Sequence, residues 1–141
     1  MTAAHRQAED LIDFVAASPS SYHAAAEGAR RLTEAGFVEQ DETEPFDAAP
    51  GGRFVIRDGA LIAWRVPADL GDRPRLRIIG AHTDSPTFKL KPHPDAYGAG
   101  WRQLGVEVYG GPLLNSWLDR ELGLAGRVVT ADGATHLVRT G

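Results

Sequence analysis

The sequence predicts a mixed α/β fold, and three observations support this prediction. Two segments near the N-terminus have helical periodicity, several later segments alternate as strands do, and two of the turns between strands are typical of hairpins. The elements follow the order helix, helix, hairpin, strand and further strands. Because this order differs from the strand–helix alternation of purely parallel sheets, we expect a mixed sheet.

The composition is that of an ordinary folded domain. Of 141 residues, 43% are hydrophobic and 24% are charged, which excludes a disordered chain. The net charge of −4 argues against nucleic acid or an anionic membrane as the main partner, because both bind clustered positive charge. There are no cysteines, so any metal would be held by His, Asp or Glu. No signal peptide or membrane span is visible, and we expect a cytoplasmic protein.

Two helices are predicted in the first 36 residues. The first runs from about Gln7 to Ala17 and the second from about Tyr22 to Ala35. Ser20 or Ser21 can cap the start of the second helix, and Gly36 is suited to its end. The apolar stripes, which we expect to pack in the core, are Ala8, Leu11, Ile12 and Val15 in the first helix and Tyr22, Ala25, Ala26, Ala29 and Leu32 in the second.

A hairpin and a short strand are predicted next. Strands at Phe54–Arg57 and Ala60–Val66 flank Asp58-Gly59, a dipeptide typical of two-residue turns in which both positions have positive φ. The apolar run Leu76–Ala81 predicts a further strand, which ends at His82.

The stretch Pro86–Gly100 contains three prolines and two glycines, which favour a domain boundary or a crossover loop that includes His93. Alternation at Leu104–Val108 then predicts a strand. A final hairpin is expected between Gly126–Thr130 and Thr135–Arg139, with Asp132-Gly133 at its turn.

His82 has the context of a metal ligand. It follows a predicted strand, and in α/β sheets sites lie beyond the carboxyl ends of strands. Asp84 is two residues away, and in an extended segment it projects to the same side as His82, where a carboxylate can orient a ligating imidazole. Turn chemistry at Asp84-Ser85-Pro86 explains the same residues without a metal, and one histidine is not a complete zinc site. The other histidines have no such context: His5, His23, His93 and His136.

Other catalytic motifs are absent from the sequence. No glycine-rich segment continues into the Gly-Lys-Ser/Thr of a phosphate-binding loop. No serine stands within Gly-x-Ser-x-Gly, so a serine hydrolase of that class is not expected. The tryptophans are interpreted as core or interface residues.

Several longer segments resemble the aspartyl aminopeptidase family of metallopeptidases. The matching segments are Gly80–Pro86, Leu90–Pro92, Gly105–Gly111 and Trp117–Val128, preceded by Phe14-Val15, Ser18-Pro19, Tyr22–Ala24 and Gly36-Phe37. Because these motifs are long and occur in order, the resemblance covers nearly the whole chain.

This resemblance implies a two-zinc aminopeptidase that removes Asp or Glu from peptide N-termini. It implies that His82 is a zinc ligand and that Asp84 supports the metal centre as a catalytic residue. Residues 1–92 would then be the N-terminal part of a catalytic α/β domain, and residues 93–141 the start of an inserted β-rich dimerisation domain. Members of the family assemble into homo-oligomeric dodecamers.

The family's remaining metal ligands and its general base have no counterpart in residues 1–141. Glu107, Asp119 and Glu121 belong to segments that match the inserted domain, so they do not replace these ligands. The last hairpin runs to Gly141 with no element to close it. We therefore expect an N-terminal portion of the enzyme that is inactive alone. The residue types also suit manganese or cobalt.

Two alternatives remain open from the sequence. The chain could be a truncated, non-catalytic subunit that acts in assembly through its apolar residues Leu113, Leu114, Trp117 and Leu118. It could also be an unrelated binding domain in which His82 and Asp84 are incidental.

Overall fold

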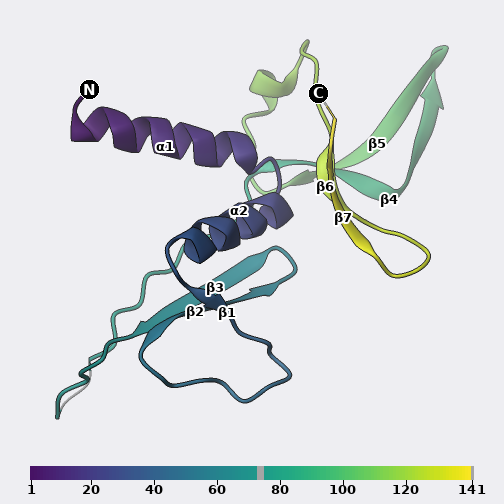
Figure 1. Ribbon diagram of the computed structural model, residues 1–141. Helices are drawn as coiled ribbons and strands as arrows, with labels where there is room; N and C mark the ends of the chain where they lie inside the picture. The colour runs from purple at the N-terminus through teal and green to yellow at the C-terminus, as the bar shows by residue number, and fades with distance from the viewer. Residues whose placement is uncertain (73–74, 141) are drawn as a thin grey trace. The chain divides into compact units, whose positions relative to one another are not determined.

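The computed structural model describes residues 1–72 and 75–140 (Figure 1). The predicted α/β class with a mixed sheet is confirmed, because β1 runs parallel to β2 while β3 runs antiparallel to it. The elements in chain order are α1 (Ala3–Ala17), α2 (Ser21–Glu34), β1 (Val38–Glu39), β2 (Gly51–Arg57), β3 (Ala60–Val66), β4 (Thr87–Gly98), β5 (Trp101–Tyr109), a 3₁₀ helix (Leu114–Trp117), β6 (Ala125–Val129) and β7 (Thr135–Arg139).

The chain forms two compact units. The first comprises Met1–Asp84 together with the segment from Gly123 onward, and the second comprises Ser85–Leu122. Both helices, the β1–β3 sheet and the β6–β7 hairpin belong to the first unit, whereas the β4–β5 hairpin and the 3₁₀ helix form the second. The expected division into a catalytic part and an inserted dimerisation part at residues 92 and 93 stays a prediction.

Both helices begin at a hydroxyl cap. The side chains of Thr2 and Ser20 accept hydrogen bonds from the backbone N–H of His5 and His23, at 3.3 and 3.4 Å. The cap at Thr2 explains why α1 begins earlier than the apolar pattern predicts. The predicted cap at Ser20 is confirmed, and so is the end of α2, where Gly36 has a φ of +81°.

The apolar stripe of α1 does not pack in a core, so that prediction is wrong. A different face of α1 meets α2: Asp10 pairs with Arg31 at 2.7 Å, and the same guanidinium lies 5.3 Å from the Phe14 ring centre. Periodicity identifies an apolar face but not whether another element covers it. The exposed members of the stripe are Leu11 (61%), Ile12 (65%) and Val15 (62%).

Small residues let α2 lie close against the sheet (Figure 1). Ala25 and Ala29 of the predicted stripe are buried, whereas Ala26 is half-buried. Ala24, which the stripe did not include, is buried as well. A Cβ at Gly28 would lie only 2.6 Å from a methyl of Leu61 on β3. Neither helix in the described part of the chain is long and apolar enough to cross a bilayer.

The β2–β3 hairpin supplies the largest core side chain. Phe54 is 2% exposed and stands opposite Ala63 in the register. The predicted turn at Asp58-Gly59 is confirmed, with one difference. Only Asp58 has a positive φ, of 55°, and Gly59 is not in the left-handed region. The turn thus has the φ pattern of type II′ rather than of type I′.

The strand predicted at Leu76–Ala81 is not formed, and His82 therefore does not end a strand. A β-strand is stabilised by hydrogen bonds to a neighbour, and no strand of the described residues pairs with this segment. Its apolar side chains remain in solvent: Leu76 is 90% exposed, Ile78 88% and Ile79 97%.

The proline-rich stretch is a strand, not the predicted boundary loop, and His93 lies within it. β4 pairs with β5 through Leu90 opposite Val106 and Asp95 opposite Leu104. Residues 91–94 bulge between these two pairs. Pro92 and Pro94 fit there because an unpaired backbone position needs no N–H donor.

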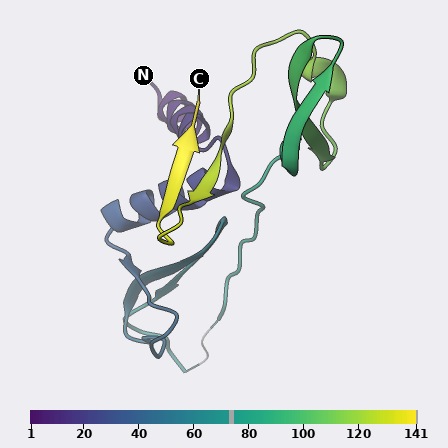
Figure 2. The same ribbon diagram turned by 90° about the vertical axis from the view of Figure 1, so that its right-hand side faces the viewer.

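The final hairpin and its turn at Gly133, with a φ of 84°, are confirmed. Figure 2 shows this β6–β7 hairpin beside α2. Arg127 of β6 forms an ion pair with Asp58, and its guanidinium lies 4.7 Å from the ring centre of Tyr22. These two contacts join β6 to the β2–β3 turn and to the start of α2.

The second unit has an exposed apolar cluster, as expected from the sequence. Trp117 packs on Phe88 of β4, with ring centres 4.9 Å apart, and is half-buried. Its neighbours Leu113, Leu114 and Leu118 are 76%, 52% and 70% exposed.

Glu27 gives α2 a pH-dependent contribution to stability. Its side chain is 11% exposed and accepts hydrogen bonds from Arg30 and Arg31 at 2.6–2.7 Å. These bonds, those of Arg30 first, lower the pKa of Glu27 to about 2 from an ordinary value of 4.5. Since the folded pKa lies below the unfolded one, the contribution is present above pH 4.5 and is lost as the pH falls toward 2.

We therefore expect Glu27→Gln to lower the Tm at neutral pH and to have a smaller effect at about pH 3 than at about pH 5. Thermal unfolding followed by circular dichroism across this range measures the difference. Glu34→Gln is the matched control, because Glu34 is 65% exposed and, among the described residues, pairs only with Arg30. A Tm difference that does not change with pH would contradict the expectation.

Candidate metal centre

The candidate ligand His82 and the carboxylate of Asp84 lie in the loop between β3 and β4. Their side chains are 77% and 44% exposed. Nδ1 of His82 is 3.8 Å from Oδ1 of Asp84, so the two predicted site residues are brought together as the spacing suggested.

A hydrogen bond indicates which tautomer a neutral His82 imidazole adopts. Nδ1 of His82 lies 2.5 Å from the backbone carbonyl oxygen of Asp84. A carbonyl oxygen only accepts, so Nδ1 carries the hydrogen and the neutral ring keeps the lone pair on Nε2. This arrangement is common among metal-binding histidines, in which a hydrogen bond from one ring nitrogen fixes the other as the ligand atom.

The intervening Thr83 connects this segment to the sheet. Its Oγ1 donates to the carbonyl oxygen of Gly59 at 2.6 Å. The acceptor belongs to the β2–β3 turn, 24 residues earlier in the chain. Sequence reasoning missed this contact, because nothing in the local pattern indicates which carbonyl a loop hydroxyl will meet.

The remaining histidines are not brought to His82. The rings of His5 and His23 share hydrogen bonds with the capping hydroxyls of Thr2 and Ser20. His136 is exposed on β7, and His93 is exposed on β4. Within residues 1–72 and 75–140, no three His, Asp or Glu side chains lie close enough together to hold a metal ion. The described residues therefore provide at most part of a metal site.

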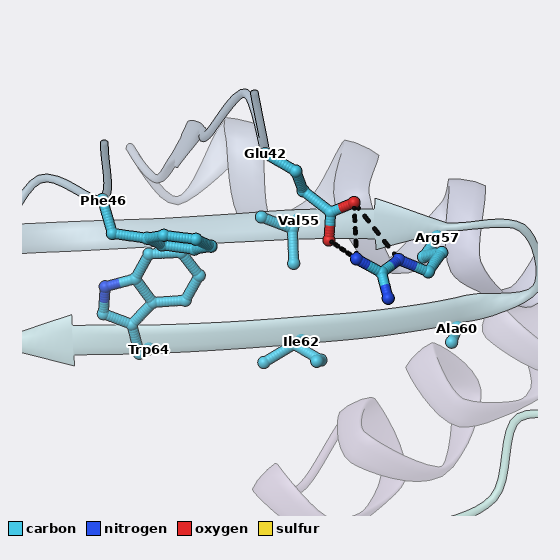
Figure 3. A pocket seen from close by; sticks show the side chains of 7 residues that line it. All are labelled: Glu42, Phe46, Val55, Arg57, Ala60, Ile62 and Trp64. Carbon is cyan, nitrogen blue, oxygen red and sulfur yellow. Dashed lines mark hydrogen bonds and ion pairs between the residues drawn. The ribbon is translucent and has the colours of Figure 1, made fainter. Parts of the chain in front are cut away.

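An open depression of about 630 Å³ lies on the face of the β2–β3 hairpin (Figure 3). Two of its rings, Phe46 and Trp64, have centres 5.6 Å apart. Arg57 donates to both carboxylate oxygens of Glu42, at 3.0–3.2 Å. The other lining residues are Val55, Ala60 and Ile62. Val55 and Ile62 stand opposite each other in the β2–β3 register, so the predicted hairpin could have indicated that these two apolar side chains share a face.

The α/β fold and the neighbouring His82 and Asp84 are compatible with a metal-dependent hydrolase, but two residues do not define that class. Residues 14–139 match the family of aminopeptidase I zinc metalloproteases (M18), and the chain belongs to this family. Aspartyl aminopeptidases are members of the same family, so the resemblance inferred from the sequence is confirmed.

Curated relatives agree with this assignment. The chain is 57% identical over 130 residues to a probable M18 family aminopeptidase 2 of Streptomyces avermitilis, covering 92% of this chain and 30% of the relative. It is 47% identical over 121 residues to the protein of the same description from Mycobacterium leprae, covering 86% of this chain and 28% of the relative. The chain thus spans about 30% of the length of these relatives.

Solved structures share the fold. Yeast aminopeptidase 1 (Ape1) superposes with a TM-score of 0.79 at 30% identity, covering 95% of this chain and 34% of that one. An M18 aminopeptidase from Thermotoga maritima superposes with a TM-score of 0.80 at 25% identity, covering 96% of this chain and 30% of that one. The mApe1 dodecamer of S. cerevisiae gives 0.78 at 30% identity, with coverages of 94% and 33%.

Zinc is the metal named in the description of the family. The residues present fit it, because zinc accepts a neutral imidazole nitrogen and carboxylate oxygens. In His82 the hydrogen bond from Nδ1 leaves Nε2 as the donor atom.

Proposed function

We propose that the chain is the N-terminal part of a two-zinc aminopeptidase that removes Asp or Glu from peptide N-termini. The observation that carries this proposal is membership of the M18 family, combined with a His82 ring whose Nε2 is available as a ligand. The further ligands and the general base would come from the part of the family's sequence that has no match in this chain. We also propose a cytoplasmic location and assembly into a homo-oligomer.

His82 would hold one zinc ion through Nε2. Asp84 would keep the ring in place through its backbone carbonyl, while its carboxylate adds negative charge beside the imidazole. Bound metal would act as a Lewis acid toward the peptide carbonyl and lower the pKa of water. His82 would bind the zinc ion and Asp84 would orient the His82 ring. Neither residue would supply the general base.

The test uses the full-length enzyme, defined as residues 1–141 followed by the rest of an M18 sequence, from the same gene or from the Streptomyces avermitilis relative. We expect it to release N-terminal Asp or Glu at least about tenfold faster than Ala, Leu or Lys, as a site with a charge-specific contact does. Removal of metal with a chelator should abolish release, and added zinc should restore it.

Two results would reject the proposal. Activity that survives complete metal removal would exclude a metallopeptidase, and equal rates for all N-terminal residues would exclude the acidic preference. The 141-residue chain alone serves as a control that should release nothing.

A second candidate function is a non-catalytic subunit that takes part in assembly. The exposed residues Leu113, Leu114 and Leu118 favour it, as does the lack of a three-residue metal cluster in the part of the chain that the structure covers. A coding sequence that ends at Gly141 would support this candidate, whereas one that continues with the family's ligands would support the enzyme.

A further inference from the structure

We propose that Thr83 is a positioning residue for the metal ligand His82, and that the β2–β3 turn is the anchor through which it acts. The proposal rests on the zinc-ligand role proposed above for His82. It assigns a function to a residue that the ligand motif itself leaves unspecified.

Local contacts shape the His82–Asp84 segment without joining it to the fold. The hydrogen bond from His82 to the Asp84 carbonyl spans only two residues. The preceding residues Leu76, Ile78 and Ile79 are exposed and belong to no strand. The hydrogen bond of the His82 ring fixes the orientation of the ring. The position of His82 relative to the rest of the fold depends on longer-range contacts.

Thr83 provides a longer-range contact. Its hydroxyl donates to the carbonyl of Gly59 at 2.6 Å, between residues 24 apart in sequence. Because Thr83 stands between His82 and Asp84, a hydrogen bond at this position restrains both neighbours. The group that matters in this contact is the hydroxyl, which donates the hydrogen bond.

The acceptor is itself held in place from two sides. A Cβ at Gly59 would lie 2.6 Å from Oγ and 3.3 Å from the backbone carbon of Ser21, so the turn lies directly against the start of α2. On the other side, Asp58 forms an ion pair with Arg127, whose guanidinium packs over the Tyr22 ring. Two elements of the first unit, α2 and β6, therefore meet at the turn that holds Thr83.

The test compares Thr83→Val, which removes the hydroxyl but keeps the shape, with Thr83→Ser, which keeps the hydroxyl. Both are made in the full-length enzyme, and zinc affinity is measured by chelator competition. We expect Thr83→Val to bind zinc about tenfold more weakly, the range typical for residues that orient a ligand. Thr83→Ser should bind zinc as the parent enzyme does.

Kinetics separate positioning from a general structural effect. In Thr83→Val, KM for the peptide should be unchanged, and kcat should return to the parent value with excess zinc. Equal zinc affinity of Thr83→Val and the parent would overturn the proposal. So would an equal loss in both variants, since the hydroxyl would then not be the cause.

A second variant tests the anchor. Gly59→Ala displaces the acceptor, because the added Cβ meets Ser21. We expect a loss of zinc affinity similar to that of Thr83→Val, with no further loss in the double variant. Additive losses of zinc affinity would show that Thr83 and Gly59 act separately, and they would overturn the proposed anchoring role of the β2–β3 turn.

His82→Ala separates the proposed ligand role of His82 from the proposed positioning role of Thr83. If it loses zinc while Thr83→Val does not, only the role of Thr83 fails. If His82→Ala keeps its full zinc content, the proposed ligand role fails first.

Discussion

If the full-length enzyme holds two zinc ions as proposed above, replacing His82 with alanine is expected to lower kcat/KM more than about 100-fold and to remove one of them. Loss of a residue that merely orients a ligand costs about 10–100-fold, and loss of the ligand itself costs more. Peptide release with an N-terminal aspartate measures activity, and elemental analysis measures bound zinc.

Two other histidine variants serve as controls. His93→Ala and His136→Ala change exposed residues on β4 and β7 and should leave zinc content and kcat/KM unchanged. Asp84→Asn keeps the backbone carbonyl that accepts from His82, so it should retain most of the zinc while lowering kcat. Full zinc content in His82→Ala would reject the ligand assignment.

The largest expected effect on stability is that of Phe54→Ala. Phe54 of β2 is 2% exposed, and truncating such a ring typically costs about 3–5 kcal/mol in the free energy of unfolding. Domains are stabilised by about 5–15 kcal/mol, so the variant should lose a large share of the total. Urea unfolding of the 141-residue chain, followed by circular dichroism, measures the change.

Ile62→Ala is the matched control on the same hairpin. Ile62 is 64% exposed, and surface substitutions usually change stability by less than about 0.5 kcal/mol. Similar losses in both variants would show that the core of the first unit is not centred on Phe54.

The elements predicted correctly are those specified by local chemistry. Ser20 caps α2 and Gly36 follows its end, because these residue types satisfy helix termini wherever the helix packs. Gly133 marks the last hairpin for a similar reason, since its φ of 84° is available to glycine at little cost.

The elements predicted wrongly depend on distant partners. The apolar run at Leu76–Ala81 has the composition of a strand, but none of the described strands pairs with it. The stripe of α1 has the right period, yet contacts from Arg31 hold another face of the helix. Pro92 and Pro94 suggested a loop because the pattern did not reveal an accommodating bulge.

In the candidate site, too, some features follow from the local sequence and others depend on distant partners. His82 and Asp84 were identifiable from a short motif, because two residues so near in sequence stay near in space. The bond from Thr83 to Gly59 and the depression formed with Glu42 and Phe46 depend on tertiary pairing. No feature of the local sequence specifies such partners.

The bulge in β4 affects how copies of this protein can associate. An exposed strand recruits another strand only through a continuous row of donors and acceptors. Pro92 and Pro94 have no N–H, and residues 91–94 are out of register with β5, so the row is interrupted along this edge. The β4 edge of the hairpin is thereby protected against edge-to-edge pairing, so copies that associate along this edge do so through side-chain packing.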